Sequence, residues 1–244
     1  MNFHRFRIIF AAIISTLNLT SQPKNPLFHH IYADHGLASD HTTVVEQDYL
    51  GYVWVGTEEG LNKFVSYNKF NFKTYKSERA DTSSINHDYV TDLFEDSQKN
   101  LWVGTISGLN LYSRSHDRFI RINDRHPVLN KHRINAIAEK NRQLWLATDN
   151  KLFVYNYKTD SIKKTFEQVE SDGDLIEFND LYTKGDHIWI GASNGLYFAQ
   201  GLELELIEGF ENVEVTSITQ SETGDIVCGT KAQGVWRINK QGEI

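Results

Sequence analysis

Short runs of apolar and β-branched residues follow one another along the chain and are separated by polar turn sequences. In one stretch these runs predict strands at 90–94, 101–104, 109–112 and 119–122. The residues at 96–100 predict a turn, in which an aspartate side chain can accept a hydrogen bond from the backbone two residues further on. No segment between the runs has the length and spacing of an amphipathic helix. The pattern therefore predicts a unit of four antiparallel strands.

The same unit recurs along the sequence. The preceding part of the chain predicts strands at 42–46, 52–56, 61–65 and 72–75 around a turn at 48–51. The second strand of each unit carries one motif, which begins at Trp54, Trp102, Trp145, Trp189 and Val227. The first copy reads Trp54-Val55-Gly56-Thr57 and is followed by Gly60-Leu61. Successive motifs start 48, 43, 44 and 38 residues apart.

Five units of four antiparallel strands predict an all-β fold, a β-propeller in which each unit is one blade. The repeated tryptophans are expected to pack between blades, and the recurring glycines to let neighbouring backbones approach. After the fifth motif, a third strand is predicted at 235–238 without a fourth. We expect residues 28–32 to supply that strand and so close the ring, because a closed ring leaves no free strand edge.

The repeat resembles the two-component regulator propeller family, whose pattern is an Asp-x-x-Gly turn, Trp-[Val/Ile]-Gly-Thr and then Gly-Leu. The first copy, 48–62, matches throughout; Lys99 replaces the turn glycine in the second, and Val227 replaces the tryptophan in the fifth. The likeness covers about residues 28–238. It implies the periplasmic sensor region of a membrane histidine kinase, where rings are typically seven-bladed. The five repeats therefore form either a closed five-bladed ring or part of a larger, seven-bladed one.

The N-terminus has the pattern of a secretory signal peptide. Arg5 and Arg7 precede an almost wholly apolar run at 8–19, which ends in small and polar residues. The run is shorter than the roughly 20 residues that a membrane span needs. We expect residues 1–21 to be removed and 22–244 to form the propeller domain in the periplasm, with no stable membrane span after cleavage. Secretion, or tethering by an uncleaved N-terminal segment, are the alternatives.

Composition and charge exclude some classes of function. The net charge of −7 disfavours nucleic-acid binding, which needs a basic surface. The one cysteine, Cys228, cannot form an intramolecular disulfide, and its place in a second strand predicts a buried structural thiol. The sequence contains no kinase motif, no Gly-x-Ser-x-Gly elbow and no phosphate loop. We expect no catalytic residues, no metal and no cofactor in this chain.

Binding is the more natural task for the loops of a propeller. In a four-stranded blade, the loop before the first strand and the hairpin between the second and third strands lie on the same face. This face would carry the candidate ligand-binding residues Asp40, His41, Glu58, Glu59, Asp88, Tyr89, Ser107, His132, Arg133, Asp149, Asn150, Asn194, Lys231 and Gln233. Such hydrogen-bonding side chains suit a carbohydrate or a protein ligand.

The sequence therefore predicts an extracytoplasmic ligand-recognition module that resembles the input region of a two-component sensor and senses an oligosaccharide. Further sensor domains or a dimer partner are expected alongside it. Two alternatives stay open. The chain could be a truncated or non-functional fragment of such a sensor, or a propeller-fold lyase or glycoside hydrolase, which would need convergent acid, base or metal groups.

Overall fold

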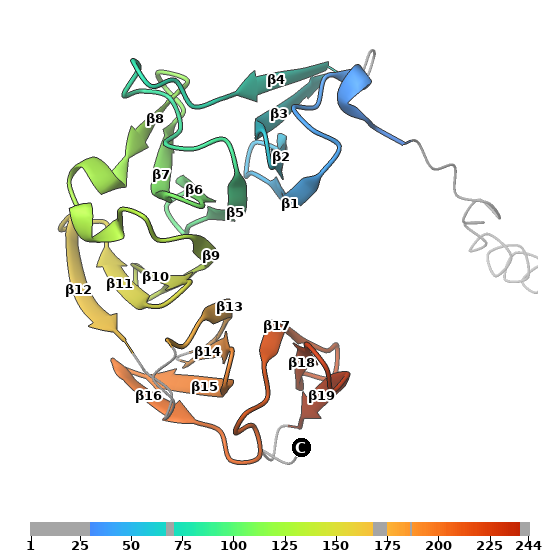
Figure 1. Cartoon of the computed structure of the whole chain (residues 1–244), viewed down its shortest axis with the longest axis vertical. Coiled ribbons are helices and arrows are strands. Elements are labelled where there is room, and N and C mark those ends of the chain that lie inside the picture. Colours follow the sequence, from blue (N-terminus) through green and yellow to red (C-terminus); the bar gives the residue numbers. More distant parts are fainter. Residues whose placement is uncertain (1–29, 67–70, 168–174, 186, 240–244) are drawn as a thin grey trace, which may run out of the picture. The chain divides into compact units, whose positions relative to one another are not determined.

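The computed structural model describes residues 30–66, 71–167, 175–185 and 187–239. The chain divides into two units, Met1–Ile31 and Tyr32–Ile244. The second unit contains all of the described strands and is shown in Figure 1. Signal-peptide residues 1–21 lie outside the described part of the chain.

The described strands are short and fall at the predicted places. Their bounds are β1 Thr42–Gln47, β2 Val53–Thr57, β3 Gly60–Ser66, β4 Asn71–Tyr75, β5 Val90–Glu95, β6 Leu101–Thr105, β7 Gly108–Ser113, β8 Arg118–Arg121, β9 Ile134–Lys140, β10 Gln143–Thr148, β11 Leu152–Asn156, β12 Ser161–Phe166, β13 Phe178–Lys184, β14 His187–Ala192, β15 Gly195–Gln200, β16 Glu203–Leu206, β17 Val215–Gln220, β18 Ile226–Thr230 and β19 Val235–Ile238. Within the same described residues there are three short 3₁₀ helices: η2 Ala33–His35, η3 Ile122–Asp124 and η4 Pro127–Leu129.

The strands form five antiparallel sheets in chain order. The first four sheets, β1–β4, β5–β8, β9–β12 and β13–β16, each have four strands, and the fifth, β17–β19, has three. The predicted all-β propeller architecture of antiparallel sheets is thereby confirmed. Strand ends differ from the expectation by about one residue; Ile122, for example, begins η3 instead of ending β8.

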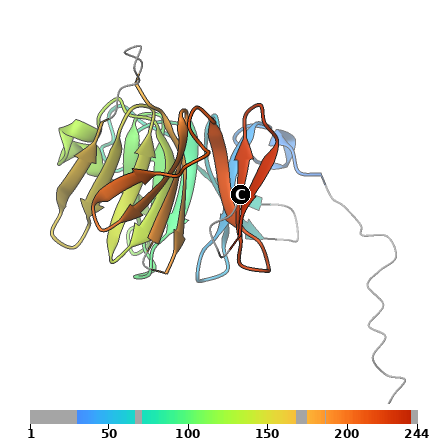
Figure 2. The same cartoon turned by 90° about the horizontal axis from the view of Figure 1, so that it is seen from below.

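Neighbouring sheets meet through their first strands. β1 contacts β5, β5 contacts β9, β9 contacts β13, and β13 contacts β17. Figure 1 shows these strands on the inner side of the arc along which the five sheets follow one another, and Figure 2 shows the sheets from the side. This radial order is that of propeller blades.

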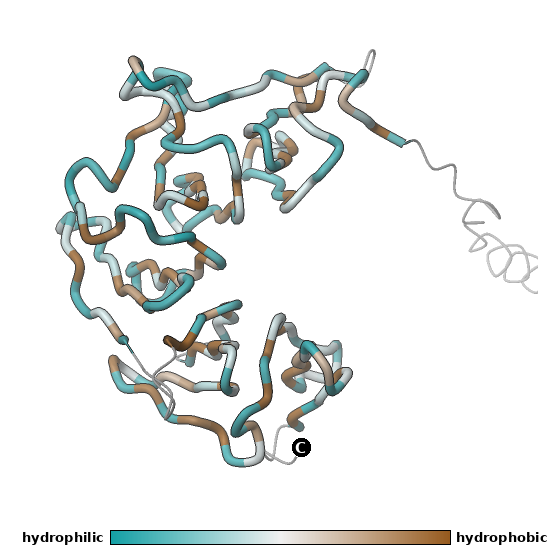
Figure 3. The backbone as a smooth tube through the Cα atoms, in the orientation of Figure 1, coloured by the Kyte–Doolittle hydropathy of each residue, from teal (hydrophilic) through white to brown (hydrophobic). Residues whose placement is uncertain are grey.

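The core consists of four apolar clusters, each between two successive sheets. The cluster between the first and second sheets joins Trp54 and Leu61 to Leu93, Val103 and Tyr112. Equivalent clusters fill the next three interfaces. Hydrophobic residues accordingly recur along the strands of every sheet in Figure 3. The second, third and fourth sheets are thus each stabilised by burying one face on the preceding sheet and the other on the next.

Glycine in the repeated motif permits this close packing, as expected. A Cβ atom added at Gly56 would lie 2.8 Å from a methyl group of Val90, and one at Gly104 would lie 2.9 Å from a methyl group of Ile134. Val90 and Ile134 stand at the start of the next sheet's first strand. The glycine therefore makes room for the neighbouring blade.

The prediction that residues 28–32 supply a closing strand can be compared with the structure only at residues 30–32. Residues 30–32 form no strand, residues 28 and 29 lie outside the described part of the chain, and the fifth sheet has three strands. Within the described residues, the packing that joins successive first strands is not repeated between β17 and β1. A local interaction favours a 3₁₀ turn over a strand after residue 32, because the backbone N–H of Tyr32 donates to the His35 ring and η2 follows directly.

Candidate functional site

In the first, second, fourth and fifth sheets, a backbone hydrogen bond holds the loop before the first strand against the hairpin between the second and third strands. Glu58 N donates to the His41 carbonyl at 3.2 Å, and Ile106 N donates to the Tyr89 carbonyl at 3.2 Å. The fourth and fifth sheets repeat the bond with Ser193 N to Glu177 O at 2.8 Å and Lys231 N to Glu214 O at 3.0 Å. These loops and hairpins form one face of the propeller, which we call the loop face.

Several predicted residues meet at the junction of the first two sheets on the loop face. The Tyr89 hydroxyl donates to Glu58 Oε1 at 3.3 Å, and His41 Nδ1 lies 3.4 Å from Glu58 Oε2. Glu59 is exposed and lies 3.8 Å from the Lys76 ammonium group. The structure thus brings His41, Glu58 and Tyr89 together across a sheet boundary.

The third sheet contributes a second group. His132 Nδ1 lies 3.1 Å from Asp149 Oδ1, and the neighbouring Arg133 is exposed. Asn150 has a buried Oδ1 atom for which the structure provides no hydrogen-bond partner.

Other predicted residues are engaged in local structure. Asp88 accepts a bond from Ser77 N at 2.6 Å, and Asp40 accepts one from Ala33 N at 2.6 Å. The remaining contacts are Ser107 O with the amides of Asn86 and Asn123, Asn194 Oδ1 with the Tyr197 hydroxyl, Lys231 with Glu214, and Gln233 O with the Trp236 indole. These hydrogen bonds and ion pairs stabilise the conformation of the loops.

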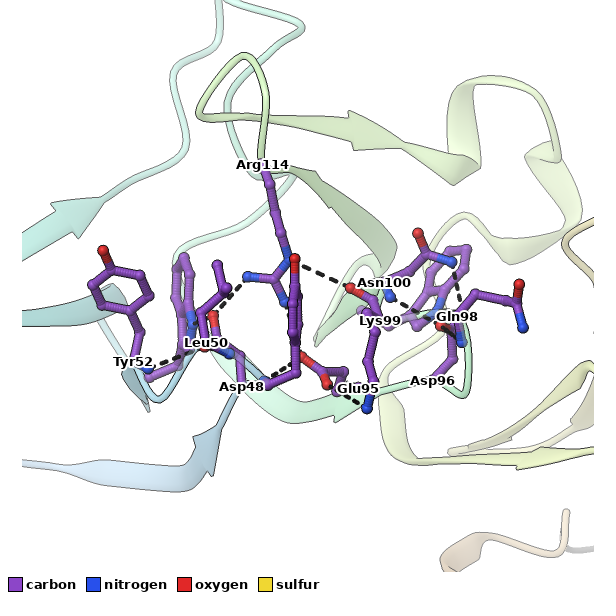
Figure 4. Close-up of polar contacts among 12 residues, drawn as sticks. Asp48, Leu50, Tyr52, Glu95, Asp96, Gln98, Lys99, Asn100 and Arg114 are labelled. Atoms are coloured by element: carbon purple, nitrogen blue, oxygen red, sulfur yellow. Dashed lines mark hydrogen bonds and ion pairs between the residues drawn. The ribbon is translucent and has the colours of Figure 1, made fainter.

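On the opposite face, the first two sheets each carry a buried aspartate, Asp48 and Asp96, which the sequence identified only as turn residues. Asp96 Oδ1 accepts bonds from the backbone N–H groups of Gln98 at 2.8 Å and Asn100 at 2.9 Å, and Oδ2 accepts the Trp102 indole N–H at 2.8 Å. Asp48 holds Trp54 in the same way at 2.9 Å. Figure 4 shows the two arrangements side by side. Each turn therefore fixes the tryptophan that packs against the next sheet.

Arg114 connects the Asp48 turn of the first sheet to the end of β5 in the second sheet. Its guanidinium lies 2.6 Å from Asp48 Oδ2 and 2.9 Å from Glu95 Oε2, and its side chain reaches between the turns in Figure 4. Burial raises the pKa of Asp48, but hydrogen bonds from Trp54 and Arg114 outweigh it and hold the pKa below its ordinary value. The first and second sheets are thus joined by a charged network as well as by apolar packing.

A further pair of inter-sheet contacts uses tyrosine and aspartate five residues apart. Asp117 accepts the hydroxyls of Tyr112 and of Tyr75 from the first sheet, both at 2.6 Å, and also contacts Lys73. Burial raises the pKa of Asp117, but the hydrogen bonds from Lys73, Tyr112 and Tyr75 outweigh burial and lower the pKa to about 2. In the third sheet Asp160 accepts the Tyr155 hydroxyl at 2.7 Å and lies 2.8 Å from Arg125 and His126. The signal that could have revealed these contacts is Tyr-x4-Asp at 112–117 and 155–160.

Aspartates on two first strands accept hydrogen bonds from the next sheet. Asp92 Oδ2 accepts the Ile137 N–H at 2.7 Å, and Asp180 Oδ2 accepts the Ile218 N–H at 2.6 Å. The pKa of Asp92 is raised to about 7, mainly by burial; the negative charges of Asp180 and Glu46 act in the same direction, whereas its backbone hydrogen bonds oppose the rise. Burial also raises the pKa of Asp180.

This shift predicts a pH dependence of stability. The ordinary pKa of Asp92 is 3.8 and the folded value is about 7, so between these pH values the folded state binds more protons than the unfolded state. The contribution of Asp92 to stability is therefore present below pH 3.8 and decreases as the pH rises to 7. Between pH 4.5 and pH 8, the free energy of unfolding of Asp92→Asn should therefore rise by about 3 kcal/mol relative to that of the parent, as measured by urea unfolding. Asp124→Asn, at an exposed position, is the control, and parallel pH profiles for Asp92→Asn and the parent would contradict the assignment.

The described residues offer little for metal or covalent chemistry. Among them no three His, Cys, Asp or Glu side chains converge as metal ligands would. Cys228 is fully buried, and burial followed by the charge of Asp180 raises the pKa of its thiol to about 12. The expected buried structural thiol is confirmed. No helix in the described part of the chain is long and apolar enough to span a bilayer.

Comparison with known proteins adds a family match and related folds. Residues 84–107, from the loop before β5 to the hairpin after β6, match the family model of the two component regulator propeller. Histidine kinase P4 of Formosa agariphila is 33% identical over 84 residues, which are 34% of this chain and 6% of that protein. The chain therefore spans a small part of this relative.

Solved structures with a similar fold include the extracellular domain of a two-component system and a lyase. The extracellular domain of a hybrid two-component system from B. thetaiotaomicron has a TM-score of 0.67 at 20% identity, and the match covers 80% of this chain and 27% of that one. A streptogramin B lyase has a TM-score of 0.64 at 14% identity, covering 85% and 68%. These likenesses establish the propeller fold. Together with the family match, they confirm that the repeats of this chain resemble those of the two-component regulator propeller.

Proposed function

We propose that this chain is the recognition module of an extracytoplasmic two-component sensor and that it binds an oligosaccharide on its loop face. The observation that carries the proposal is the family match at residues 84–107, which ends in a hairpin of the loop face. Relatives of this kind include a histidine kinase and the extracellular domain of a hybrid two-component system. The proposal assigns the ligand to the face that the repeat itself builds.

The chemistry of the loop face supports a polyhydroxylated ligand. Asp40, Glu59 and Arg133 are exposed on it, and Tyr89 offers an aromatic ring next to the Glu58 carboxylate. Carboxylates and guanidinium groups form charge-assisted hydrogen bonds with hydroxyls, and an aromatic ring provides apolar area with a polar tip. Ligand binding transmits a signal only if the ligand binds more tightly to one of two packing arrangements between the propeller and a partner domain.

The same proposal includes export to the periplasm, with residues 1–21 as a signal peptide and 22–244 as the mature propeller. The basic start and the apolar run at 8–19 support it. We expect the protein recovered from the periplasmic fraction to begin near Gln22, as determined by N-terminal sequencing. An intact Met1 in a cytoplasmic fraction would contradict this part of the proposal.

Ligand binding is tested by thermal unfolding of residues 22–244 with a panel of oligosaccharides. A ligand that binds only the folded state, present at 100 times its Kd, should stabilise the protein by about 2.7 kcal/mol and raise Tm. Arg133→Ala and Glu59→Ala should reduce the shift without changing Tm of the free protein, because both side chains are exposed.

The matched control is Lys158→Ala, which is exposed on the turn between β11 and β12, on the opposite face. It should leave the ligand-induced shift unchanged. If Lys158→Ala reduced the ligand-induced Tm shift as much as Arg133→Ala and Glu59→Ala do, the binding site would not be on the loop face. A panel without any effect on Tm would overturn the proposed ligand class.

A further inference from the structure

The charged side chains at the repeated positions of the loop face have polar partners, with one exception. In every sheet these positions are the residue immediately before the first strand and the two residues after the second strand, and we call them the rim; the structure describes all of them. The paired rim residues are Glu58 with His41, Glu59 with Lys76, Asp149 with His132, Glu177 with Asn135 and Glu214 with Lys231. The exception is Arg133, which is exposed and has neither a hydrogen bond nor an ion pair with a described side chain.

The hairpin of the third sheet differs from the other hairpins of the loop face. In the first, second and fourth sheets, a glycine begins the third strand, whereas in the third sheet Lys151 has this place and β11 begins one residue later. Gly60 and Gly108 have φ of 146° and 114°, a conformation that residues with a side chain rarely adopt. Lysine therefore forces the hairpin between β10 and β11 into another conformation.

This change removes the backbone bond that joins loop and hairpin in the other sheets. The equivalent bond, from the Asp149 N–H to the Arg133 carbonyl, is absent from the described residues. Side chains form the connection in its place, since Asp149 Oδ1 lies 3.1 Å from His132 Nδ1 and the His132 ring packs edge-on against Phe153 at 5.3 Å. Asp149 is the only acidic residue of its hairpin. Because its carboxylate pairs with His132, the hairpin supplies no counter-ion for Arg133.

The loop that carries Arg133 is basic in an acidic chain. Residues 130–133 contain Lys131, His132 and Arg133 and no acidic residue, although the net charge of the chain is −7. Lys131 is exposed as well. Strand β9 begins at the next residue and lies on the inner side of the arc in Figure 1, so Arg133 stands at the inner end of the loop face. The rim therefore offers one positive group without a partner at a position where a ligand of the loop face would pass.

We propose, on the basis of the proposed function, that the loop before β9 is a subsite for the negative group of an acidic oligosaccharide and that Arg133 binds this group. A guanidinium can donate two parallel hydrogen bonds to the oxygens of one anionic group, and it is less strongly hydrated than an ammonium group. The carboxylate of a uronic acid and a sulfate ester both present such oxygens. Lys131 adds an attraction that acts over a longer range and that salt screens.

The test measures Kd of the full chain by calorimetry for oligogalacturonates and for carrageenan oligosaccharides, each beside its neutral form, carboxyl-reduced or desulfated. One acidic class should bind, and its neutral form should bind at least about tenfold more weakly, because it loses a charge-assisted hydrogen bond. Arg133→Gln should weaken binding of the acidic form by the same factor and leave binding of the neutral form unchanged. The acidic class that binds identifies the source of the negative group.

The matched control is Lys158→Gln, which removes the same charge from an exposed position on the opposite face and should change Kd by less than about twofold. Equal affinity for acidic and neutral forms, unchanged in Arg133→Gln, would overturn the subsite and leave the proposed function intact. A loss in Lys158→Gln as large as that in Arg133→Gln would reveal an effect of net charge and would also overturn the subsite. If no oligosaccharide bound, acidic or neutral, the subsite and the proposed function would both be wrong.

Discussion

Replacing Asp96 with alanine should lower the free energy of unfolding by about 3 kcal/mol, because several buried donors lose their acceptor together. The carboxylate is 2% exposed and accepts the Trp102 indole and two backbone N–H groups of its turn. A buried donor without a partner incurs its full desolvation cost, which is greater than the net value of the hydrogen bond. Urea unfolding with a two-state fit measures the change.

Two comparisons make this prediction specific. Asp124→Ala removes an exposed carboxylate close to a sheet end and should change stability by less than about 0.5 kcal/mol. Asp48→Ala should cost more than Asp96→Ala, since it also removes the Arg114 ion pair with Asp48 at 2.6 Å. A loss for Asp96→Ala no greater than that for Asp124→Ala would show that the turn and its tryptophan are held by packing alone.

Leu109→Ala should destabilise the propeller by about 2–5 kcal/mol, the usual cost of a cavity at a fully buried leucine. Leu109 is 0% exposed in the cluster between the second and third sheets, where Trp102, Ile134 and Phe153 surround it. The equivalent residue of the fifth sheet offers a matched control. Val235→Ala should change the free energy of unfolding by less than about 0.5 kcal/mol, because its side chain is 72% exposed.

The difference between the two variants in the free energy of unfolding measures how far the face of the fifth sheet that carries Val235 is exposed in solution. Both positions follow the same motif glycine and have the same register in their sheets. A cost for Val235→Ala close to that of Leu109→Ala would mean that Val235 is buried in solution. A small cost for both would mean that the second and third sheets do not share a packed core.

The recurrence of the motif made most of the fold predictable. Strand positions in the first two sheets agree with the expectation to about one residue, because the alternation of apolar side chains and the turn at Asp48 or Asp96 are local features. Even Lys99, which replaces the turn glycine, keeps the left-handed turn with φ of 68° where Gly51 has 85°. The buried bond from each aspartate to its tryptophan was not predicted, since the two side chains meet only when strand and turn fold together.

The candidate site was predictable in outline only. Topology alone brings the loops before the first strands to the hairpins between the second and third strands, and the backbone bond between His41 and Glu58 agrees with it. Which side chains then meet across a sheet boundary depends on the packing angle of two blades. Two such contacts across a sheet boundary are the hydrogen bond from Tyr89 to Glu58 and the hydrogen bond from Tyr75 to Asp117.

The amino-acid sequence by itself determined the number of repeats, the strands of the first two repeats and the motif tryptophans and glycines that pack between sheets, because these depend on local pattern and on identical motifs. Only the tertiary structure decided whether the ends meet. Closure depends on the sum of the small rotations between neighbouring sheets, and no single repeat contains that sum. Val45 and Val235 are exposed, whereas the equivalent residues are buried in every other sheet, because no other described sheet packs on these two faces.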